Sequence, residues 1–196
     1  MICFCKSEME IITINKNGFY RCPNCHYLKK INTVSLEKEK ARYDMHVVDS
    51  GYEQYMKGVY DEIRPYINGD CIDYGCGKKH ILADIICENG LNCDYYDYFY
   101  FKDINFKKYD TIILIEVFEH INDLLGLFSK LNSMLKSSGR IIIKTKVIPT
   151  EIDNWWYLRD VTHVSFVDEL SMKKLCDNFN MSSKLIDGSF FVIERI

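Results

Sequence analysis

The sequence predicts an α/β fold: a mainly parallel sheet that ends in a C-terminal antiparallel hairpin, with a small separate hairpin at the N-terminus. Three observations lead to this prediction. Strand-like and helix-like segments alternate from residue 71 onward, which is typical of sheets whose strands are joined by helices. The run Tyr109–Ile115 is apolar along most of its length, as expected for a strand covered on both faces. Asp187-Gly188 near the C-terminus is a strong signal for a hairpin turn.

Length and composition narrow the class of protein. The 196 residues suit one α/β domain with a small appendage, and 47% hydrophobic residues are normal for a folded chain. A net charge of −3 gives no support for a nucleic-acid partner, although it leaves a small RNA open. No apolar run reaches the length of a membrane-spanning helix, and the N-terminus lacks the regions of a signal peptide. We therefore expect a cytoplasmic protein without a membrane partner; its oligomeric state stays open.

Two kinds of element are expected before residue 69. The first is a β-hairpin, with strands at 9–14 and 19–21 joined by a turn at 15–18. The second is a pair of helical segments at 37–48 and 51–67, the latter with apolar and aromatic residues at spacings of three and four. We expect this helical region to connect the hairpin to the sheet and to cap a pocket.

Four cysteines bracket the predicted hairpin. Cys3 and Cys5 precede it, and Cys22 and Cys25 close it. Two cysteine pairs around a hairpin resemble a zinc ribbon, in which four thiolates hold a structural ion and stabilise a segment with little core. The spacing of the first pair is shorter than usual, so His26 is a further candidate ligand. A ribbon that binds no metal, or free thiols, is the alternative.

The remaining elements follow in alternation. They are a strand with a glycine-rich turn at 71–77, a helix at 80–89, strands at 91–96 and 109–115, a helix at 120–135 ended by Ser137-Ser138-Gly139, a strand at 140–146, a helix at 167–178, and strands at 183–186 and 190–194. The helix that usually connects the second and third strands is expected to be reduced or absent.

The glycine-rich turn is the strongest functional signal. Asp73, Gly75 and Gly77 stand where the first strand of the sheet ends and a helix follows. Glycines allow backbone to approach a ligand closely, and a helix N-terminus offers N–H groups, so this segment predicts a nucleotide cradle. Asp97 ends the second strand, twenty positions after Gly77, where an acid can accept the hydroxyls of a ribose. Asp94 is the alternative acid.

This segment resembles the first motif of Rossmann-like, class I S-adenosylmethionine-dependent methyltransferases. The resemblance implies that Asp73, Gly75 and Gly77 face the amino-acid end of the cofactor, and that Asp97, Ile115 and Glu116 complete its binding site. Together with the cysteine pairs around the hairpin, this resemblance leads us to expect three parts: a zinc-ribbon-like element at 1–30, a helical connector and pocket cap at 31–68, and the methyltransferase domain at 69–196. The aromatic residues directly after Asp97 are candidates for the wall around the adenine ring.

A second motif follows the third strand. Glu116, Glu119 and His120 form an E-x-x-E-H pattern, and on one face of a first helical turn they would suit a divalent metal such as magnesium. The pattern looks like that of ubiquinone-pathway O-methyltransferases and of small-RNA 2′-O-methyltransferases. That resemblance implies a metal at these residues with His163 as the fourth ligand. The alternative is acid–base work by Glu119, His120 or His163, or a structural role for the acids.

The expected function is therefore methyl transfer from S-adenosylmethionine, with an oxygen of a small-molecule acceptor as the target. Tyr43 and His46 are further candidates for the wall of the pocket, as is the aromatic segment 155–166. Two alternatives remain open. One is a methyltransferase fold that has lost catalysis and binds a partner, and the other is an RNA 2′-O-methyltransferase.

Overall fold

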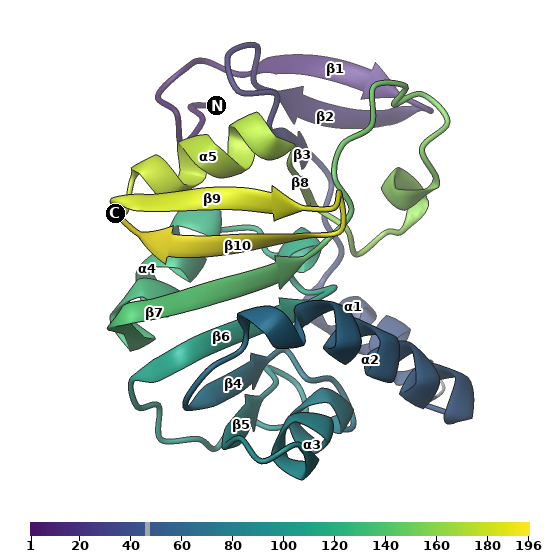
Figure 1. Cartoon of the computed structure of the whole chain (residues 1–196). Coiled ribbons are helices and arrows are strands. Elements are labelled where there is room, and N and C mark those ends of the chain that lie inside the picture. Colours follow the sequence, from purple (N-terminus) through teal and green to yellow (C-terminus); the bar gives the residue numbers. More distant parts are fainter. Residues whose placement is uncertain (46–47) are drawn as a thin grey trace.

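A six-stranded sheet forms the centre of the molecule (Figure 1). The structure is a computed structural model that describes residues 1–45 and 48–196. The strand order is β5-β4-β6-β7-β10-β9. Strands β5, β4, β6 and β7 run parallel, whereas β10 is antiparallel to both of its neighbours. This confirms the predicted mainly parallel sheet with a closing hairpin. The strands span β4 (Cys71–Tyr74), β5 (Cys93–Tyr96), β6 (Tyr109–Ile115), β7 (Leu135–Lys144), β9 (Met181–Ile186) and β10 (Phe190–Arg195).

Helices cover both faces of this sheet (Figure 1). One face packs against α2 (Ser50–Ile63) and α3 (Ile81–Glu88), and the other against α4 (Leu124–Met134) and α5 (Glu169–Asp177). Successive side chains of a strand point to opposite faces, so Ile113 joins one core and its two neighbours join the other. Double burial explains why β6 is apolar from Ile112 to Ile115. Among the described residues, none of the helices combines the length and apolar character that a membrane crossing requires.

A second, smaller sheet lies at the N-terminus. Its order is β1-β2-β3-β8, with antiparallel neighbours throughout. The hairpin of β1 (Glu10–Ile14) and β2 (Asn17–Arg21) is as predicted, and Asn15 and Lys16 adopt the positive φ of a tight hairpin turn. Strands β3 (Leu28–Lys30) and β8 (Ser165–Phe166) were not predicted. They have three and two residues, too few to show an alternation of apolar and polar side chains. The N-terminal element therefore includes a strand from the C-terminal half; its boundary at residue 30 stays a prediction.

The segment between β6 and α4 differs from the prediction. Helix α4 begins at Leu124, where the Asp123 carboxylate accepts a hydrogen bond from the N–H of Gly126 (2.9 Å). Upstream, Glu116 has a φ of +52°, and only a single 3-10 turn, η2 (Phe118–His120), follows. Because a left-handed residue cannot start an α-helix, the expected common helical face of Glu116, Glu119 and His120 is wrong.

The predicted stop at Ser137-Ser138-Gly139 is also wrong. Helix α4 ends at Met134, and these three residues belong to β7. The pairing of β7 with β6 shifts register between Tyr109 and Thr111, which is the signature of a bulge. Gly139 lies there against the carbonyl of Tyr109, where an added Cβ would approach to 2.9 Å. A glycine is therefore needed here because β7 is crowded at this point, and it does not mark the end of a helix. As expected, no helix lies between β5 and β6 in the described chain.

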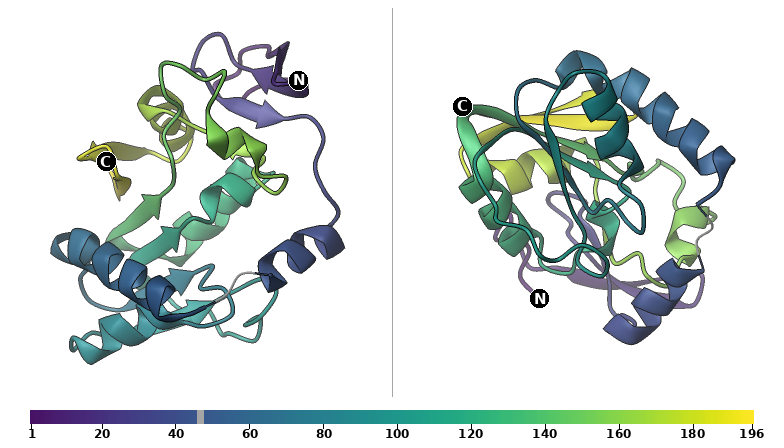
Figure 2. Two further views of the ribbon diagram at one scale, coloured as in Figure 1. Left: turned by 90° about the vertical axis from the view of Figure 1, so that its right-hand side faces the viewer. Right: turned by 90° about the horizontal axis from the view of Figure 1, so that it is seen from below.

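Three further elements surround the edge of the main sheet at which the parallel strands end (Figure 2, left). They are α1 (Leu36–Asp44), the 3-10 turn η3 (Trp156–Arg159), and the start of α2; η1 (Arg64–Tyr66) continues the far end of α2. Helix α1 has no buried residues, so it lies over the edge rather than in the core. Ligands of open α/β sheets bind at this edge, which makes it the place to look for a functional site.

Candidate functional site

A cavity of about 590 Å³ opens at the carboxyl ends of the parallel strands. Its wall contains Gly75 and Gly77 from the glycine turn and Asp97 after β5. It also contains the predicted residues that follow β6 and the predicted histidine of the 155–166 segment: Ile115, Glu116, Glu119, His120 and His163. Side chains far apart in the sequence therefore meet in one cavity; their roles toward cofactor and acceptor stay predictions.

The glycine turn has a backbone conformation that only glycines adopt easily, as its two glycines indicated. Gly75 has a φ of +99° and Gly77 a φ of +70°, values that side chains rarely tolerate. A Cβ on Gly75 would come within 2.3 Å of Val117, whereas a Cβ on Gly77 would meet open space. Gly75 is thus required by packing against the segment after β6. Gly77 keeps the cavity side of the turn clear for a ligand.

Asp97 holds the turn as well as facing the cavity. Its carboxylate accepts hydrogen bonds from the N–H groups of Gly77 (3.0 Å), Phe99 (2.7 Å) and Tyr100 (3.1 Å). The competing acid, Asp94, instead accepts from the hydroxyl of Tyr109 (2.9 Å) and does not line the cavity. This placement favours Asp97 as the ribose acid, which stays a prediction.

Asp73 occupies a different place from the two glycines. Its side chain is 4% exposed and lies behind the turn rather than in the cavity wall. Burial, with the charge of Asp97 nearby, raises the pKa of Asp73 to about 7. Its predicted contact with the amino-acid end of the cofactor stays a prediction.

Two carboxyl groups follow β6. The Glu119 side chain is fully buried, and its Oε2 accepts a hydrogen bond from the hydroxyl of Thr145 (3.0 Å). Its Oε1 is buried and, within the described chain, has no hydrogen-bond partner. Glu116 accepts from the hydroxyl of Tyr157 (3.1 Å), and burial together with the Glu119 carboxylate raises the pKa of Glu116 to about 7. Burial also raises the pKa of Glu119.

Two imidazoles complete this group. The Nδ1 atoms of His120 and His163 lie 3.1 Å and 2.9 Å from the backbone carbonyls of Thr162 and Tyr157. A carbonyl only accepts, so each Nδ1 carries the proton and each Nε2 is the basic nitrogen. Glu119, His120 and His163 each offer a ligand atom within 4.8 Å of the others. Burial lowers the pKa of His163 to about 4, which keeps its ring neutral. Glu116 is not part of this group of three.

Tyr157 is a site residue that the sequence did not single out. Its hydroxyl contacts Glu116 and lies 3.3 Å from the hydroxyl of Thr145, while its ring packs on His163 with centroids 4.1 Å apart. One side chain thus touches both the carboxyl pair and an imidazole. From the sequence it was included only as one ring of the segment 155–166, which was expected to form part of the pocket wall.

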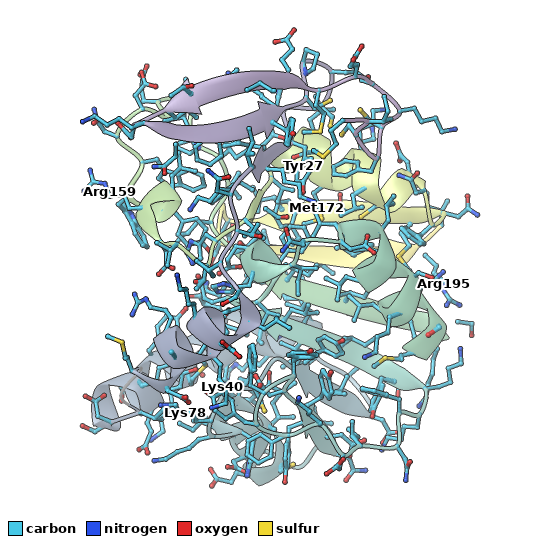
Figure 3. The ribbon with its side chains drawn as sticks, turned by 180° about the vertical axis from the view of Figure 1, so that it is seen from behind. Tyr27, Lys40, Lys78, Arg159, Met172 and Arg195 are labelled. Atoms are coloured by element: carbon cyan, nitrogen blue, oxygen red, sulfur yellow. The ribbon has the colours of Figure 1, made fainter. Side chains whose placement is uncertain are left out.

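Helix α1 covers the cavity from the other side. The Tyr43 ring stands edge-on to His120, with centroids 5.2 Å apart, which agrees with its predicted place in the pocket wall. Arg42 pairs with Asp160 (3.2 Å). Lys40 and Lys78 both bond to Asp44 at the end of the helix, where Figure 3 labels them. The predicted contribution of His46 lies outside the described residues.

The four N-terminal cysteines form one cluster. Their Sγ atoms all lie within 4.8 Å of one another, with 3.5 Å between Cys3 and Cys25 and 3.4 Å between Cys5 and Cys22. Four sulfurs bound at about 2.3 Å to a tetrahedral zinc ion are roughly 3.8 Å apart, so small shifts would accommodate the ion. The N–H of Cys25 donates to the Sγ of Cys22 (3.4 Å), which orients that sulfur.

The cysteines differ in how readily they lose a proton. A hydrogen bond from the Cys25 thiol lowers the pKa of Cys3, and the same contact raises the pKa of Cys25, so the pair shares one proton. His26 does not join the four sulfurs; its Nδ1 lies 2.8 Å from the Asp168 carboxylate. The donor set that the structure offers to a cation is therefore four sulfurs.

Fold and site together define the class of this protein. A glycine turn after the first strand of the sheet, an acid after the second, and a parallel sheet closed by a hairpin are those of a class I S-adenosylmethionine-dependent methyltransferase. The chain belongs to the methyltransferase family, because the family model of the methyltransferase domain matches residues 27–182. The enzyme class and the cofactor expected from the first motif are thus confirmed. No curated protein matches this chain.

Solved structures with this fold are distant in sequence. Magnesium protoporphyrin IX methyltransferase from Synechocystis PCC 6803, with bound S-adenosylhomocysteine, has a TM-score of 0.54 at 15% identity; the match covers 82% of this chain and 94% of that one. An O-methyltransferase of neocarzinostatin biosynthesis, in complex with S-adenosylmethionine and 2-hydroxy-5-methyl naphthoic acid, has a TM-score of 0.55 at 12% identity, covering 82% and 60%. At these identities the similarity is one of fold.

Proposed function

We propose that this methyltransferase transfers the methyl group to an oxygen of a small-molecule acceptor. The observation that carries the proposal is the group of Glu119, His120 and His163 at the edge of the cavity. Such a group is needed when the acceptor is a hydroxyl, because a hydroxyl must lose its proton as it attacks the methyl carbon. Transfer to a more basic acceptor would need alignment and the exclusion of water alone.

The same three residues fit a divalent metal better than a general base. The Glu119 Oε1 is buried and has no hydrogen-bond partner among the described residues, and it lies 3.9 Å from the Nε2 of His120. His163, with its pKa lowered to about 4, is a weak base at neutral pH but is in the neutral form that binds metals. A cation held by these residues would lower the pKa of an acceptor hydroxyl. Two imidazoles with one carboxylate suit manganese, iron, cobalt or zinc better than the magnesium expected from the sequence.

This chain's own residues would orient the site. Thr145 fixes one oxygen of Glu119, and the carbonyls of Thr162 and Tyr157 fix the tautomers of the two histidines. The turn at Gly77 and the carboxylate of Asp97 would hold the cofactor so that its methyl group faces this group of residues. Helix α1 covers the cavity and would help to exclude water.

The cavity wall favours a small planar acceptor over RNA. Tyr55 and Trp156 line the cavity yet are 42% and 60% exposed, so their rings are available to a flat ligand. Carboxyl groups outnumber cations in the wall, since five acids (Glu39, Asp97, Glu116, Glu119 and Asp160) face two basic residues (Arg42 and Lys78). One of the two cations, Arg42, is already paired with Asp160, so the wall offers little attraction to a polyanionic backbone.

A metal titration and a methyl-transfer assay test this function. Manganese binding followed by electron paramagnetic resonance should weaken at least about tenfold in Glu119→Gln, which replaces one ligand oxygen. Equal manganese affinity in the two proteins would reject the metal. Hydroxylated naphthoic acids, like those bound by the neocarzinostatin enzyme, and an RNA with a free 2′-hydroxyl serve as acceptors with radiolabelled cofactor. Methylation of the RNA alone would reject the small-molecule proposal.

A further inference from the structure

The N-terminal sheet contacts both segments that carry the candidate site. The N–H of Lys30 in β3 donates to the carbonyl of Val164 (2.9 Å), and the N–H of Val164 donates to the carbonyl of Glu119 (2.7 Å). Val164 directly follows His163 in the chain. A single residue therefore joins β3 to the backbone of both site segments.

A buried pair of hydroxyl groups makes a second connection. The hydroxyl of Tyr27 lies 3.0 Å from the Oγ of Ser165, and Ser165 donates to the carbonyl of Ile121 (2.6 Å). Because Ser165 uses its own proton on Ile121, the Tyr27 hydroxyl is the donor between them. Tyr27 is 4% exposed, and Figure 3 shows it where the N-terminal sheet faces the rest of the molecule. Ile121 directly follows His120, so this connection also ends at the site.

Two lysines of β3 complete the attachment. The ammonium of Lys29 donates to the carbonyl of Asn122 (2.7 Å), and that of Lys30 donates to the carbonyl of Asp160 (2.7 Å). Lys30 is a buried residue, so its charge is costly without this acceptor. The short strand β3 thus holds the segment around residue 120 and the segment around residue 163 from the same side.

The position of β3 depends in turn on the cysteines. The N–H of Cys22 donates to the carbonyl of Tyr27 (2.9 Å), and Cys25 lies only two residues before Tyr27. The N-terminal sheet is small, and a cation on four thiolates is the usual way to stabilise such a segment. Loss of the cation would release the turn from which β3 starts.

We propose that the four-cysteine cluster is a positioning device for the reactive centre. A cation on its thiolates holds Tyr27 and β3 in place, and these hold Glu119, His120 and His163 relative to one another. Tyr27 and Ser165 are positioning residues, since they act through the backbone beside the histidines. The inference rests on the proposed function only in taking those three residues as the reactive centre.

Nuclear magnetic resonance of the imidazole nitrogens tests this without an acceptor. The protein has five histidines, few enough to assign. We expect Tyr27→Phe to shift or broaden the signals of His120 and His163. The signals of His80, which stacks on Tyr95 in the edge strand β5, should stay in place. Tyr20→Phe is the matched control. It removes a hydroxyl from the same small sheet, and among the described residues that hydroxyl makes no hydrogen bond to the site segments, whereas that of Tyr27 lies 3.0 Å from Ser165. Removing zinc with a chelator should affect the same two histidines.

The outcomes separate this inference from the proposed function. Unchanged His120 and His163 signals in Tyr27→Phe overturn it, and so does a response to Tyr27→Phe that zinc removal fails to reproduce. If chelation unfolds the whole chain, the variants Tyr27→Phe and Ser165→Ala are measured without chelator. Unchanged His120 and His163 signals in both variants would then overturn the inference. A protein in which these signals respond as expected but manganese does not bind would keep the inference and reject the metal of the proposed function.

Discussion

Asp97→Asn is the sharpest test of how the cofactor is held. The carboxylate accepts three backbone hydrogen bonds, two on Oδ1 from Phe99 and Tyr100 and one on Oδ2 from Gly77. An asparagine can keep the first two only by turning its NH₂ group toward the N–H of Gly77. One charge-assisted hydrogen bond is then lost, at a cost of about 1.5–3 kcal/mol. This loss is present with and without cofactor, so it lowers the stability. The Kd for the cofactor should rise because the ribose hydroxyls lose a charged acceptor, and one charge-assisted bond of this size corresponds to a rise of roughly 10- to 100-fold.

Isothermal titration with S-adenosylhomocysteine measures the effect, with urea unfolding as a check on the fold. Asp94→Asn is the matched control, because that carboxylate bonds to the Tyr109 hydroxyl and lies 3.1 Å from the Lys107 ammonium. It should lower the stability while leaving the Kd unchanged. The reasoning would be refuted by an unchanged Kd in Asp97→Asn, or by an equal rise in Asp94→Asn.

Three further outcomes are expected. Gly75→Ala should lower the free energy of unfolding by at least about 2 kcal/mol in urea, because of its left-handed φ and the contact with Val117; Gly90→Ala, with a positive φ but open space, should cost about 1 kcal/mol, and equal losses would contradict the packing argument. Burial raises the pKa of Asp73 to about 7, so the free energy of unfolding of the apoprotein should fall as pH rises from about 4 to 7 and the buried carboxyl ionises. In urea titrations at stepped pH, Asp73→Asn should remove up to about 4 kcal/mol of this fall. The same pH dependence in the variant and the wild type would contradict this expectation. Chelation should lower the melting temperature of the wild type but have little further effect on Cys25→Ser, measured by calorimetry; a chelator effect of the same size in both would argue against the thiolate site.

Local signals in the sequence were sufficient for much of the fold. Strand β6 ends where its apolar run ends. The two strands of the closing hairpin are joined by the turn at Asp187-Gly188, and both of these residues have the positive φ of such a turn. The glycine turn was equally visible, because Gly75 and Gly77 are needed for a backbone shape that belongs to the turn itself. Such features depend on neighbours within a few residues, so a single chain is enough to reveal them.

The errors share a cause. Glu116 looked like the start of a helix, but its backbone continues the ladder by donating to the carbonyl of Lys144 (2.9 Å) and then bends with a positive φ. Gly139 looked like a helix stop, but it belongs to a bulge in β7 opposite Tyr109. In both cases a contact with a distant strand outweighed the local preference, and propensity alone carries no information about that partner.

The sequence by itself determined the class of fold, the glycine cradle, the acid after the second strand and the pairing of cysteines around a hairpin, since each follows from covalent geometry or short-range spacing. Only the tertiary structure decided that Glu119, His120 and His163 form a group of three without Glu116, that Tyr157 joins them, and that β3 and β8 bind the N-terminal element to the site. These depend on where segments that lie from 41 to 138 residues apart in the sequence come together. That placement is set by packing of the whole core, which no local pattern encodes.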